Sequence, residues 1–310
     1  MKSYDDAKLR ALGPAEPDLE QNRQTIPLRD EHETSAWVVQ RNRENSDGSP
    51  RPLVVLFHGG GFTLGTADHM IPYARGLAHL FNAVVLSATY RLAPEHLHPY
   101  GPKDAWDALQ WAAANAQSLG ADPGAGFVVG GVSAGGNLAA VLNQQAKDNA
   151  LNPPLTGCWS VVPLLEPPKK YADRWFSRKQ NANAPCLSTA EQDLLDGYYA
   201  ADKSSLWYSP FNGKEAFVGL SRTYLQVCGG DPLRDDGLVL YQALRDAGVQ
   251  TRIDVYPGMP HGFWTAFPGY KTSELFMQDL AEGFGWLLEK RFDAQKVESV
   301  LYIPSHSTSD

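Results

Sequence analysis

The sequence predicts an α/β fold in which a mostly parallel central sheet is flanked by helices and partly covered by a cap. Two observations lead to this prediction. Six short apolar runs are spread along the 310 residues, and each is typical of a strand that is buried on both faces. Helical stretches separate several of these runs, and this alternation is typical of a parallel sheet with helices on both sides.

The expected strands are rich in β-branched, aromatic and other apolar residues. In chain order they are residues 53–57, 83–86, 127–129, 158–162, 223–228 and 252–256. Residues 41–50 are polar and contain Gly and Pro, so a turn between strands is expected there.

The expected helices lie between or after these strands, over residues 104–119, 135–147, 238–247 and 273–290. In the first of them the apolar side chains gather mostly on one side, as in a helix that packs on a sheet. The third ends at Gly248, a residue type that favours helix ends. Ligands of such sheets bind beyond the carboxyl ends of the strands, so the reacting residues are expected there.

Two segments fall outside this alternation and are expected to form a cap on one domain that spans residues 1–310. Residues from 1 to about 35 are polar and contain proline, with weak helical periodicity over 4–12. Residues from about 166 to 210 are polar and rich in aromatic side chains. A stretch of this length between two strands is typical of an inserted lid.

Composition argues against several classes of partner. The formal net charge is -8 and no dense block of Lys or Arg occurs, which disfavours nucleic acid or an anionic membrane as the main partner. Cys158, Cys186 and Cys228 fit neither a disulfide framework nor a zinc ligand set. No long apolar run predicts a membrane span, and the N-terminal residues lack the apolar stretch of a signal peptide. A cytoplasmic protein is therefore expected.

Ser133 is the predicted nucleophile. It stands at the centre of Gly131-Val132-Ser133-Ala134-Gly135, a Gly-x-Ser-x-Gly motif between an expected strand and an expected helix. A sharp turn there presents the serine hydroxyl, and glycines two positions to either side prevent side-chain collisions. The helix N-terminus adds N–H groups that favour negative charge. An ordinary glycine-rich turn is the alternative interpretation, which the strand–helix context disfavours.

A glycine loop after the first apolar run is expected to bind the oxyanion. The loop is His58-Gly-Gly-Gly61, and its backbone can approach a substrate closely. Acyl transfer needs N–H donors for a negatively charged tetrahedral oxygen, and we assign those of Gly60, Gly61 and Ala134. A phosphate-binding loop is the rival interpretation, but no Lys-Ser/Thr follows and the glycine spacing differs from the nucleotide-binding pattern. His58 is expected to be structural.

Asp231 and His261 are the predicted acid and base. A serine hydroxyl needs a general base that is oriented by a third group. In proteins with this serine motif the acid and then the histidine follow the nucleophile, each after a strand. Asp231 is the first carboxylate after the fifth apolar run, and His261 follows the sixth. Asp235 and Asp236 are expected to begin the next helix, where their negative charges interact favourably with the helix dipole. No metal-ligand pattern is found, so no cofactor or metal is implied.

Together these residues resemble the hormone-sensitive lipase-like family of α/β-hydrolases, the bacterial-type carboxylesterase group. The motifs that carry the resemblance extend over residues 52–290 and comprise the glycine loop from His58, Tyr-Arg-Leu-Ala-Pro-Glu from Tyr90, Gly-Val-Ser-Ala-Gly-Gly from Gly131, Asp-Pro-Leu-Arg-Asp from Asp231 and His-Gly-Phe from His261. The resemblance implies the α/β-hydrolase fold, with a cap from the N-terminal segment and the insertion. It further implies that the Tyr90 motif supports the active-site loops without reacting.

Two departures from the family pattern are visible. Val132 stands where the family usually has Asp or Thr before the serine, so the resemblance assigns no subfamily. The segment before His58 is also shorter than is common in the family. A reduced N-terminal half of the cap and a wider mouth are therefore expected.

The sequence thus predicts a serine carboxylesterase that acts on a small-molecule ester with a short to medium acyl chain or on an ester of a specialised metabolite. Phe263, Trp264, Phe267 and the aromatic residues of the insertion are equally consistent with an apolar pocket and with core. Hydrolysis of an amide or a lactone, and acyl transfer to an alcohol, use the same three side chains and stay open. A homodimer is compatible with the sequence.

A small-molecule receptor is the alternative from a different class. Plant gibberellin receptors share the fold and the motif set but lack the catalytic histidine. The presence of His261 favours an enzyme.

Overall fold

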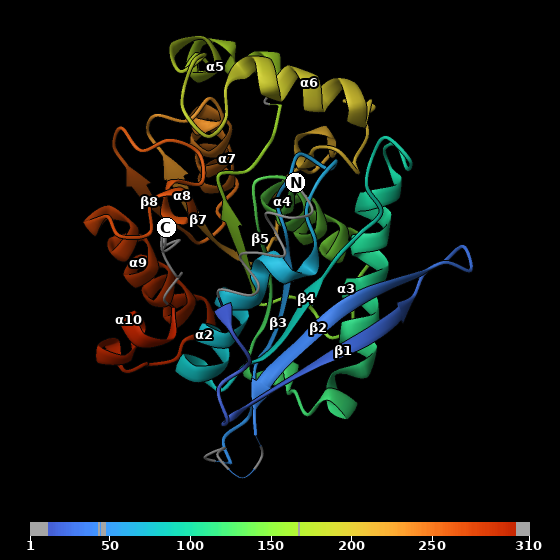
Figure 1. Cartoon of the computed structure of the whole chain (residues 1–310). Coiled ribbons are helices and arrows are strands. Elements are labelled where there is room, and N and C mark those ends of the chain that lie inside the picture. The colour runs from blue at the N-terminus through green and yellow to red at the C-terminus, as the bar shows by residue number, and fades with distance from the viewer. Residues whose placement is uncertain (1–11, 43, 45–47, 167, 302–310) are drawn as a thin grey trace.

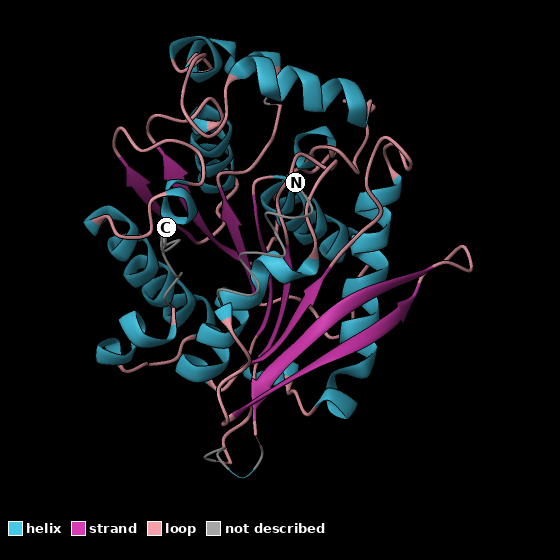
Figure 2. Ribbon diagram, in the orientation of Figure 1, coloured by secondary structure: helices cyan, strands magenta, loops and turns pink. Residues whose placement is uncertain are grey.

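The computed structural model describes residues 12–42, 44, 48–166 and 168–301, and an eight-stranded sheet with the order β1-β2-β4-β3-β5-β6-β7-β8 lies at its centre (Figures 1 and 2). The strands are β1 (Leu19–Pro27), β2 (Glu33–Arg41), β3 (Leu53–Phe57), β4 (Val84–Ala88), β5 (Phe127–Val132), β6 (Gly157–Val161), β7 (Arg222–Cys228) and β8 (Thr251–Tyr256). The pairings from β4 through β8 are parallel, whereas β1 with β2 and β2 with β4 are antiparallel. The predicted mostly parallel sheet is confirmed.

Helices cover both faces of this sheet (Figure 2). On one face lie α2 (Ile71–Phe81) and α9 (Lys271–Leu288), and on the other lie α3 (Tyr100–Leu119), α4 (Ala134–Asp148) and α7 (Arg234–Asp246). Along β3 the side chains alternate between the faces: Val54 and Leu56 pack with the first set, and Leu53, Val55 and Phe57 pack with the second. Burial on both faces is why the run is apolar at every position.

The N-terminal segment differs from the sequence prediction. Residues from 1 to about 35 were expected in the cap, but β1 and the start of β2 extend the sheet instead. Both strands carry many partly exposed polar residues, so their apolar positions form no continuous run. They are strands because β1 pairs antiparallel with β2, and β2 pairs antiparallel with β4. The periodicity noted over 4–12 falls almost entirely outside the described residues.

The connection from β6 to β7 lies across the ends towards which the parallel strands point (Figure 1). We call residues 165–220 of this connection the cap. It holds the short helix α5 (Ser177–Gln180), α6 (Thr189–Tyr199) and two 3-10 segments. A capping box begins α6, because the Ser188 hydroxyl accepts from the N–H of Glu191 while the Glu191 carboxylate accepts from the N–H of Ser188.

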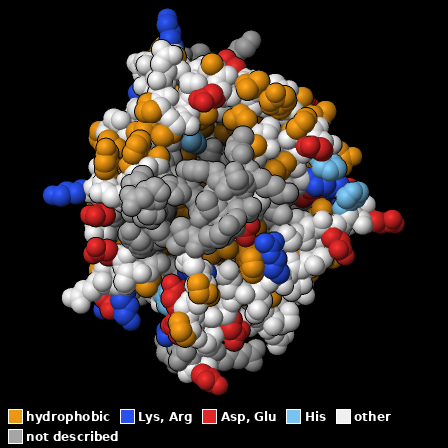
Figure 3. All heavy atoms as spheres, in the orientation of Figure 1, with side chains coloured by type: hydrophobic (Ala, Val, Ile, Leu, Met, Phe, Trp, Pro, Cys, Tyr) orange, Lys and Arg blue, Asp and Glu red, His pale blue; other side chains and the backbone are white. Residues whose placement is uncertain are grey.

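The surface of the cap carries several exposed apolar side chains, and Figure 3 shows hydrophobic groups over the top of the molecule. Phe176, Leu194 and Tyr198 are among them. Among the helices that the structure describes, none combines the length and the apolar character needed to cross a bilayer.

Candidate active site

Ser133 occupies the tight turn between β5 and α4. Its backbone lies at φ 59° and ψ −115°, a strained conformation for a residue with a side chain. A Cβ atom at Gly131 would collide with the carbonyl oxygen of Gly135, and one at Gly135 would collide with the carbonyl oxygen of Phe57. Both motif glycines are therefore required by close backbone approach, as the sequence predicted.

A continuous set of hydrogen bonds joins Ser133, His261 and Asp231. The Oγ of Ser133 lies 3.0 Å from Nε2 of His261, and Nδ1 of that ring lies 2.7 Å from Oδ2 of Asp231. With the ring proton on Nδ1, the imidazole donates to the carboxylate and accepts from the serine hydroxyl. Asp231 is fully buried, and its Oδ1 also accepts from the N–H of Leu233 at 2.8 Å.

Two adjacent loops position Asp231 and His261, the predicted acid and base. Asp231 follows β7 and His261 follows β8, and these strands are parallel neighbours. The N–H of Gly229 donates to the carbonyl of Tyr256 at 2.8 Å, and the N–H of Gly230 donates to that of Met259 at 2.9 Å. A Cβ atom at Gly229 or Gly230 would lie about 2.9 Å or 2.8 Å from backbone atoms of Gly258. The double glycine before Asp231 thus brings the two loops together.

The glycine loop after β3 forms another wall of the same site. Gly60 and Gly61 have φ values of 114° and 58°, and Gly60 accepts from the N–H groups of Thr63 and Leu64 through its carbonyl. A side chain at Gly60 would collide with the backbone of Leu64. The predicted third donor, Ala134, is the first residue of α4, directly after the serine.

His58 is buried next to this loop, where its Nδ1 lies 2.7 Å from the carbonyl oxygen of Gly59 and its Nε2 lies 3.0 Å from the hydroxyl of Thr89. Its ring stacks on Tyr90 with centroids 4.5 Å apart, and the Tyr90 hydroxyl donates to the His58 carbonyl at 2.9 Å. Arg91, the next residue of that motif, forms two hydrogen bonds of 2.7 Å to the carboxylate of Asp104. These contacts agree with the expectation that the Tyr90 motif supports the glycine loop without reacting.

A cavity of about 350 Å³ lies above Ser133 and beneath the cap. Gly60, Gly61, Ser133 and His261 all line it, whereas Asp231 lies behind the imidazole. The remaining wall is largely apolar and includes Leu64, Met70, Tyr73, Leu187, Leu195 and Trp264, with His69, Cys186, Gln192 and Thr265 as polar members. The Trp264 ring N–H donates to the Tyr73 hydroxyl at 2.7 Å, which fixes both rings at the cavity wall.

Several of these lining residues were not singled out in the sequence. Met70 lies directly before α2 and Tyr73 lies in its first turn. This helix was not predicted, although its apolar residues recur at helical spacing. Gln192 and Leu195 lie on α6, whose capping box was the available signal.

The cysteines differ in environment. Cys158 and Cys228 are buried, whereas Cys186 is exposed and lines the cavity. Partial loss of solvent around its sulfur, with the nearby Asp231 and Glu191 charges, raises the pKa of the Cys186 thiol. Within the described ranges, no three His, Cys, Asp or Glu side chains are grouped as a metal ion would require.

The strand order, the serine turn and the cap over the strand ends define an α/β-hydrolase. A family model described as alpha/beta hydrolase fold matches residues 54–265, and the chain belongs to this family. The resemblance predicted from the motifs is confirmed.

Two relatives and one solved structure are similar over most of the chain. A versiconal hemiacetal acetate esterase of Dothistroma septosporum is 34% identical over 247 residues, which are 78% of this chain and 75% of that protein. The carboxylesterase NlhH of Mycobacterium tuberculosis is 39% identical over 221 residues, 68% of this chain and 66% of that one. The crystal structure of vibralactone cyclase has a TM-score of 0.85 and 31% identity, and the match covers 93% of this chain and 85% of the cyclase. The predicted enzyme class, a hydrolase, is confirmed.

Proposed function

We propose that the protein hydrolyses carboxylic esters of small-molecule alcohols through an acyl-enzyme on Ser133. The observation that carries this proposal is the hydrogen-bonded relay from Ser133 through His261 to the buried Asp231, which opens on a cavity beside Gly60 and Gly61. Nucleophile, base and orienting acid are thus within hydrogen-bond reach of one another, as acyl transfer requires.

In the first half-reaction, the Oγ of Ser133 attacks the ester carbonyl carbon while its proton passes to Nε2 of His261. Asp231 holds the ring proton on Nδ1 and stabilises the imidazolium. The tetrahedral oxyanion accepts from the N–H groups of Gly60, Gly61 and Ala134. The C–O bond to the alcohol then breaks, and His261 gives its proton to the departing oxygen.

In the second half-reaction, water takes the place of the alcohol. His261 removes a proton from the water while the water oxygen attacks the acyl carbon. When the second tetrahedral intermediate collapses, the proton returns to the Oγ of Ser133 and the carboxylic acid leaves. Only the ester and water are consumed, and Ser133 and His261 return to their starting states.

Cavity size and lining support esters with short to medium acyl chains. A volume of about 350 Å³ holds a small ester, and its mostly apolar wall favours uncharged acyl and alcohol groups. Similarity to an esterase that is named for an acetate ester supports the same range. Similarity to a cyclase that is named for a lactone supports a second candidate, transfer of the acyl group to an alcohol instead of water.

The test is a panel of p-nitrophenyl esters of increasing acyl length, with an anilide and a lactone included, on the wild type and on Ser133→Ala. We expect turnover of the short esters and a loss of about 10⁴-fold or more in kcat for the variant, with an unchanged melting temperature. Full activity of folded Ser133→Ala would refute the assignment. Ester formation with an added alcohol would favour transfer, and no turnover of any compound would favour a receptor.

A further inference from the structure

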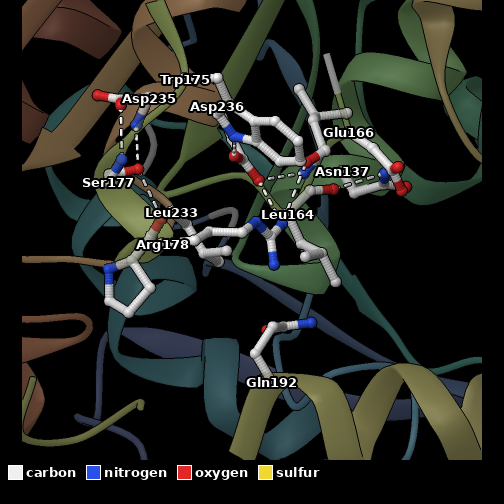
Figure 4. A network of polar contacts seen from close by, with 12 residues as sticks. Asn137, Leu164, Glu166, Trp175, Ser177, Arg178, Gln192, Leu233, Asp235 and Asp236 are labelled. Carbon is white, nitrogen blue, oxygen red and sulfur yellow. Dashed lines mark hydrogen bonds and ion pairs between the residues drawn. The ribbon is translucent and has the colours of Figure 1, made fainter. Parts of the chain in front are cut away.

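Two buried carboxylates stand at the start of α7, directly after the loop of the proposed acid. Figure 4 shows the Asp236 carboxylate between the side chains of Trp175 and Arg178. It accepts from Nε1 of Trp175 at 2.6 Å, from the N–H of Leu165 at 2.9 Å and from Nη2 of Arg178 at 3.0 Å. Asp236 is fully buried, and all three donors belong to the cap.

The neighbouring carboxylate binds the same cap turn. Asp235 accepts from the N–H groups of Phe176 at 2.6 Å and Ser177 at 2.7 Å. The Ser177 hydroxyl donates to the carbonyl of Pro232 at 2.7 Å and accepts from the N–H of Asp235 at 3.1 Å. Both carboxylates therefore attach residues 175–178 to the segment that follows Asp231.

The same part of the cap reaches the backbone of the proposed acid itself. The side-chain amide of Asn181 donates to the carbonyl of Asp231 at 2.9 Å and more weakly to that of Gly229 at 3.4 Å. Asp231 thus has its carboxylate on His261 and its carbonyl on the cap.

A second line of contacts leads from Asp236 to the roof of the cavity. Arg178, its ion-pair partner, accepts at its carbonyl from the Thr189 hydroxyl at 2.7 Å. Thr189 is the first residue of α6, and Gln192 and Leu195 of that helix line the cavity. Figure 4 shows Gln192 on this helix, facing the network.

Burial makes this network sensitive to the charge of Asp236. An ionised carboxylate without water needs its cation and its N–H donors, and removal of any of them leaves a buried polar group unsatisfied. Burial raises the pKa of Asp236 to about 7, while Arg178, Trp175 and the Leu165 N–H oppose this rise and the charge of Asp231 adds to it.

We propose that Asp236 is a positioning residue, which holds α6 and the backbone of Asp231 in one arrangement. The Asp231 carboxylate is then aligned with His261 only when the cap is packed against the start of α7. The proposal rests on the proposed function of Ser133, His261 and Asp231. Asp236 touches none of the reacting atoms and acts through the cap turn and Asn181.

The kinetic test compares Asp236→Asn, Asn181→Ala and the double variant, with Asp254→Asn as a control. Asp254 accepts from the Tyr224 hydroxyl and pairs with Arg252 on β8, so its variant also loses a partly buried carboxylate. Well below every melting temperature, we expect Asp236→Asn to lose about tenfold to a hundredfold in kcat, with a smaller rise in KM. The control is expected to keep the kcat of the wild type.

Coupling distinguishes positioning from a loss of stability. If both residues act on the backbone of Asp231, the double variant should lose less kcat than the product of the two single losses. Multiplicative losses, or an unchanged kcat in folded Asp236→Asn, would overturn the proposal. Trp175→Phe, which keeps a ring but removes one donor to Asp236, replaces that variant if it fails to fold, with a smaller loss in kcat expected.

Hydrogen exchange gives a readout that does not depend on ester turnover. In Asp236→Asn, residues 165–181 and 229–233 are expected to exchange faster together, whereas Asp254→Asn leaves both segments as in the wild type. Faster exchange in the cap alone would overturn the link to the acid. If the wild type turns over no ester, the proposed function fails while this measurement still decides whether Asp236 joins the two segments.

Discussion

The sheet and the cap contribute to the site in different ways. Ser133, Asp231 and His261 each follow the end of a parallel strand, and ladder pairing between neighbouring strands fixes the distances between their loops. The described residues of the cap form no strand ladder, and they include exposed apolar residues such as Leu194 and Phe176. The proposed chemistry is thus set by backbone register, whereas the shape of the cavity depends on how the cap packs, through buried side chains such as Leu187 and Tyr199 and through buried polar contacts such as those of Asp236. The two regions should therefore respond differently to substitution.

The largest effect is expected within the sheet-borne relay. Asp231→Asn keeps the shape of the side chain but favours the wrong tautomer of His261, because the amide can donate to Nδ1 instead of accepting from it. We expect kcat to fall by about 10⁴-fold, with little change in KM for short esters. Steady-state kinetics together with a thermal melt check this. A loss below tenfold in folded protein would mean that another carboxylate orients the ring.

A smaller effect is expected where the two regions touch. A Cβ atom at Gly61 would lie 2.7 Å from Cδ1 of Leu195 on α6. Gly61→Ala should therefore push the cap away and disturb an oxyanion donor, at a cost of about a hundredfold in kcat/KM.

Adding Leu195→Ala is expected to restore part of that loss, because the new methyl group then has room. The matched comparison is Gly60→Ala, whose side chain would meet the backbone of Leu64 and should gain nothing from Leu195→Ala. If Leu195→Ala changes kcat/KM of both glycine variants by the same factor, the loss in Gly61→Ala arises within the glycine loop and not from contact with the cap.

A milder effect is expected from modification of the cap without change to the sheet. Cys186 is exposed at the cavity, whereas Cys158 and Cys228 are buried, so N-ethylmaleimide should label Cys186 first and lower ester turnover by about tenfold through steric block. Labelling should accelerate as pH rises, because the pKa of this thiol is raised and the thiolate reacts. Cys186→Ala should keep its activity in the reagent, and mass spectrometry identifies the labelled residue.

The smallest expected effect is on stability and concerns Asp236. Its pKa in the folded protein is raised from 3.8 to about 7 by burial, so between these pH values the folded state binds a proton that the unfolded state does not. The stabilisation that this proton contributes is fully present below the unfolded pKa of 3.8, and it is lost as pH rises through the folded pKa of about 7. The melting temperature of the wild type minus that of Asp236→Asn should therefore decrease from pH 5 to pH 8. An increase over this range would show that Arg178 outweighs burial.

The central sheet could be predicted from the sequence because burial on both faces demands apolar residues at every position, as in residues 53–57. The first two strands could not, because an edge ribbon leaves many side chains in water and its pairing is set by β4, far along the chain. Geometry explains the same contrast within the site. Gly131 and Gly135 are visible as a motif because backbone contact allows no other residue.

The cap residues of the site have no such marker. The sequence predicts Asp235 and Asp236 only as charges at a helix start, and their burial depends on donors that lie 59 to 71 positions earlier in the chain. A side chain that is fixed by distant partners leaves no local pattern. Gln192 and Leu195 are further examples, since nothing near them in the sequence indicates that α6 faces a cavity.

The chain leaves the sheet after β6 and returns in β7, its parallel neighbour, with Gly157 paired to Arg222 and Val161 to Gln226. Both junctions are therefore fixed independently of what is inserted between them. We therefore expect that this segment can be exchanged, shortened or extended without disturbing the register of β6 and β7. Such a graft would redirect the choice of substrate, provided that the incoming module supplies a cation and a backbone donor for the carboxylate at position 236.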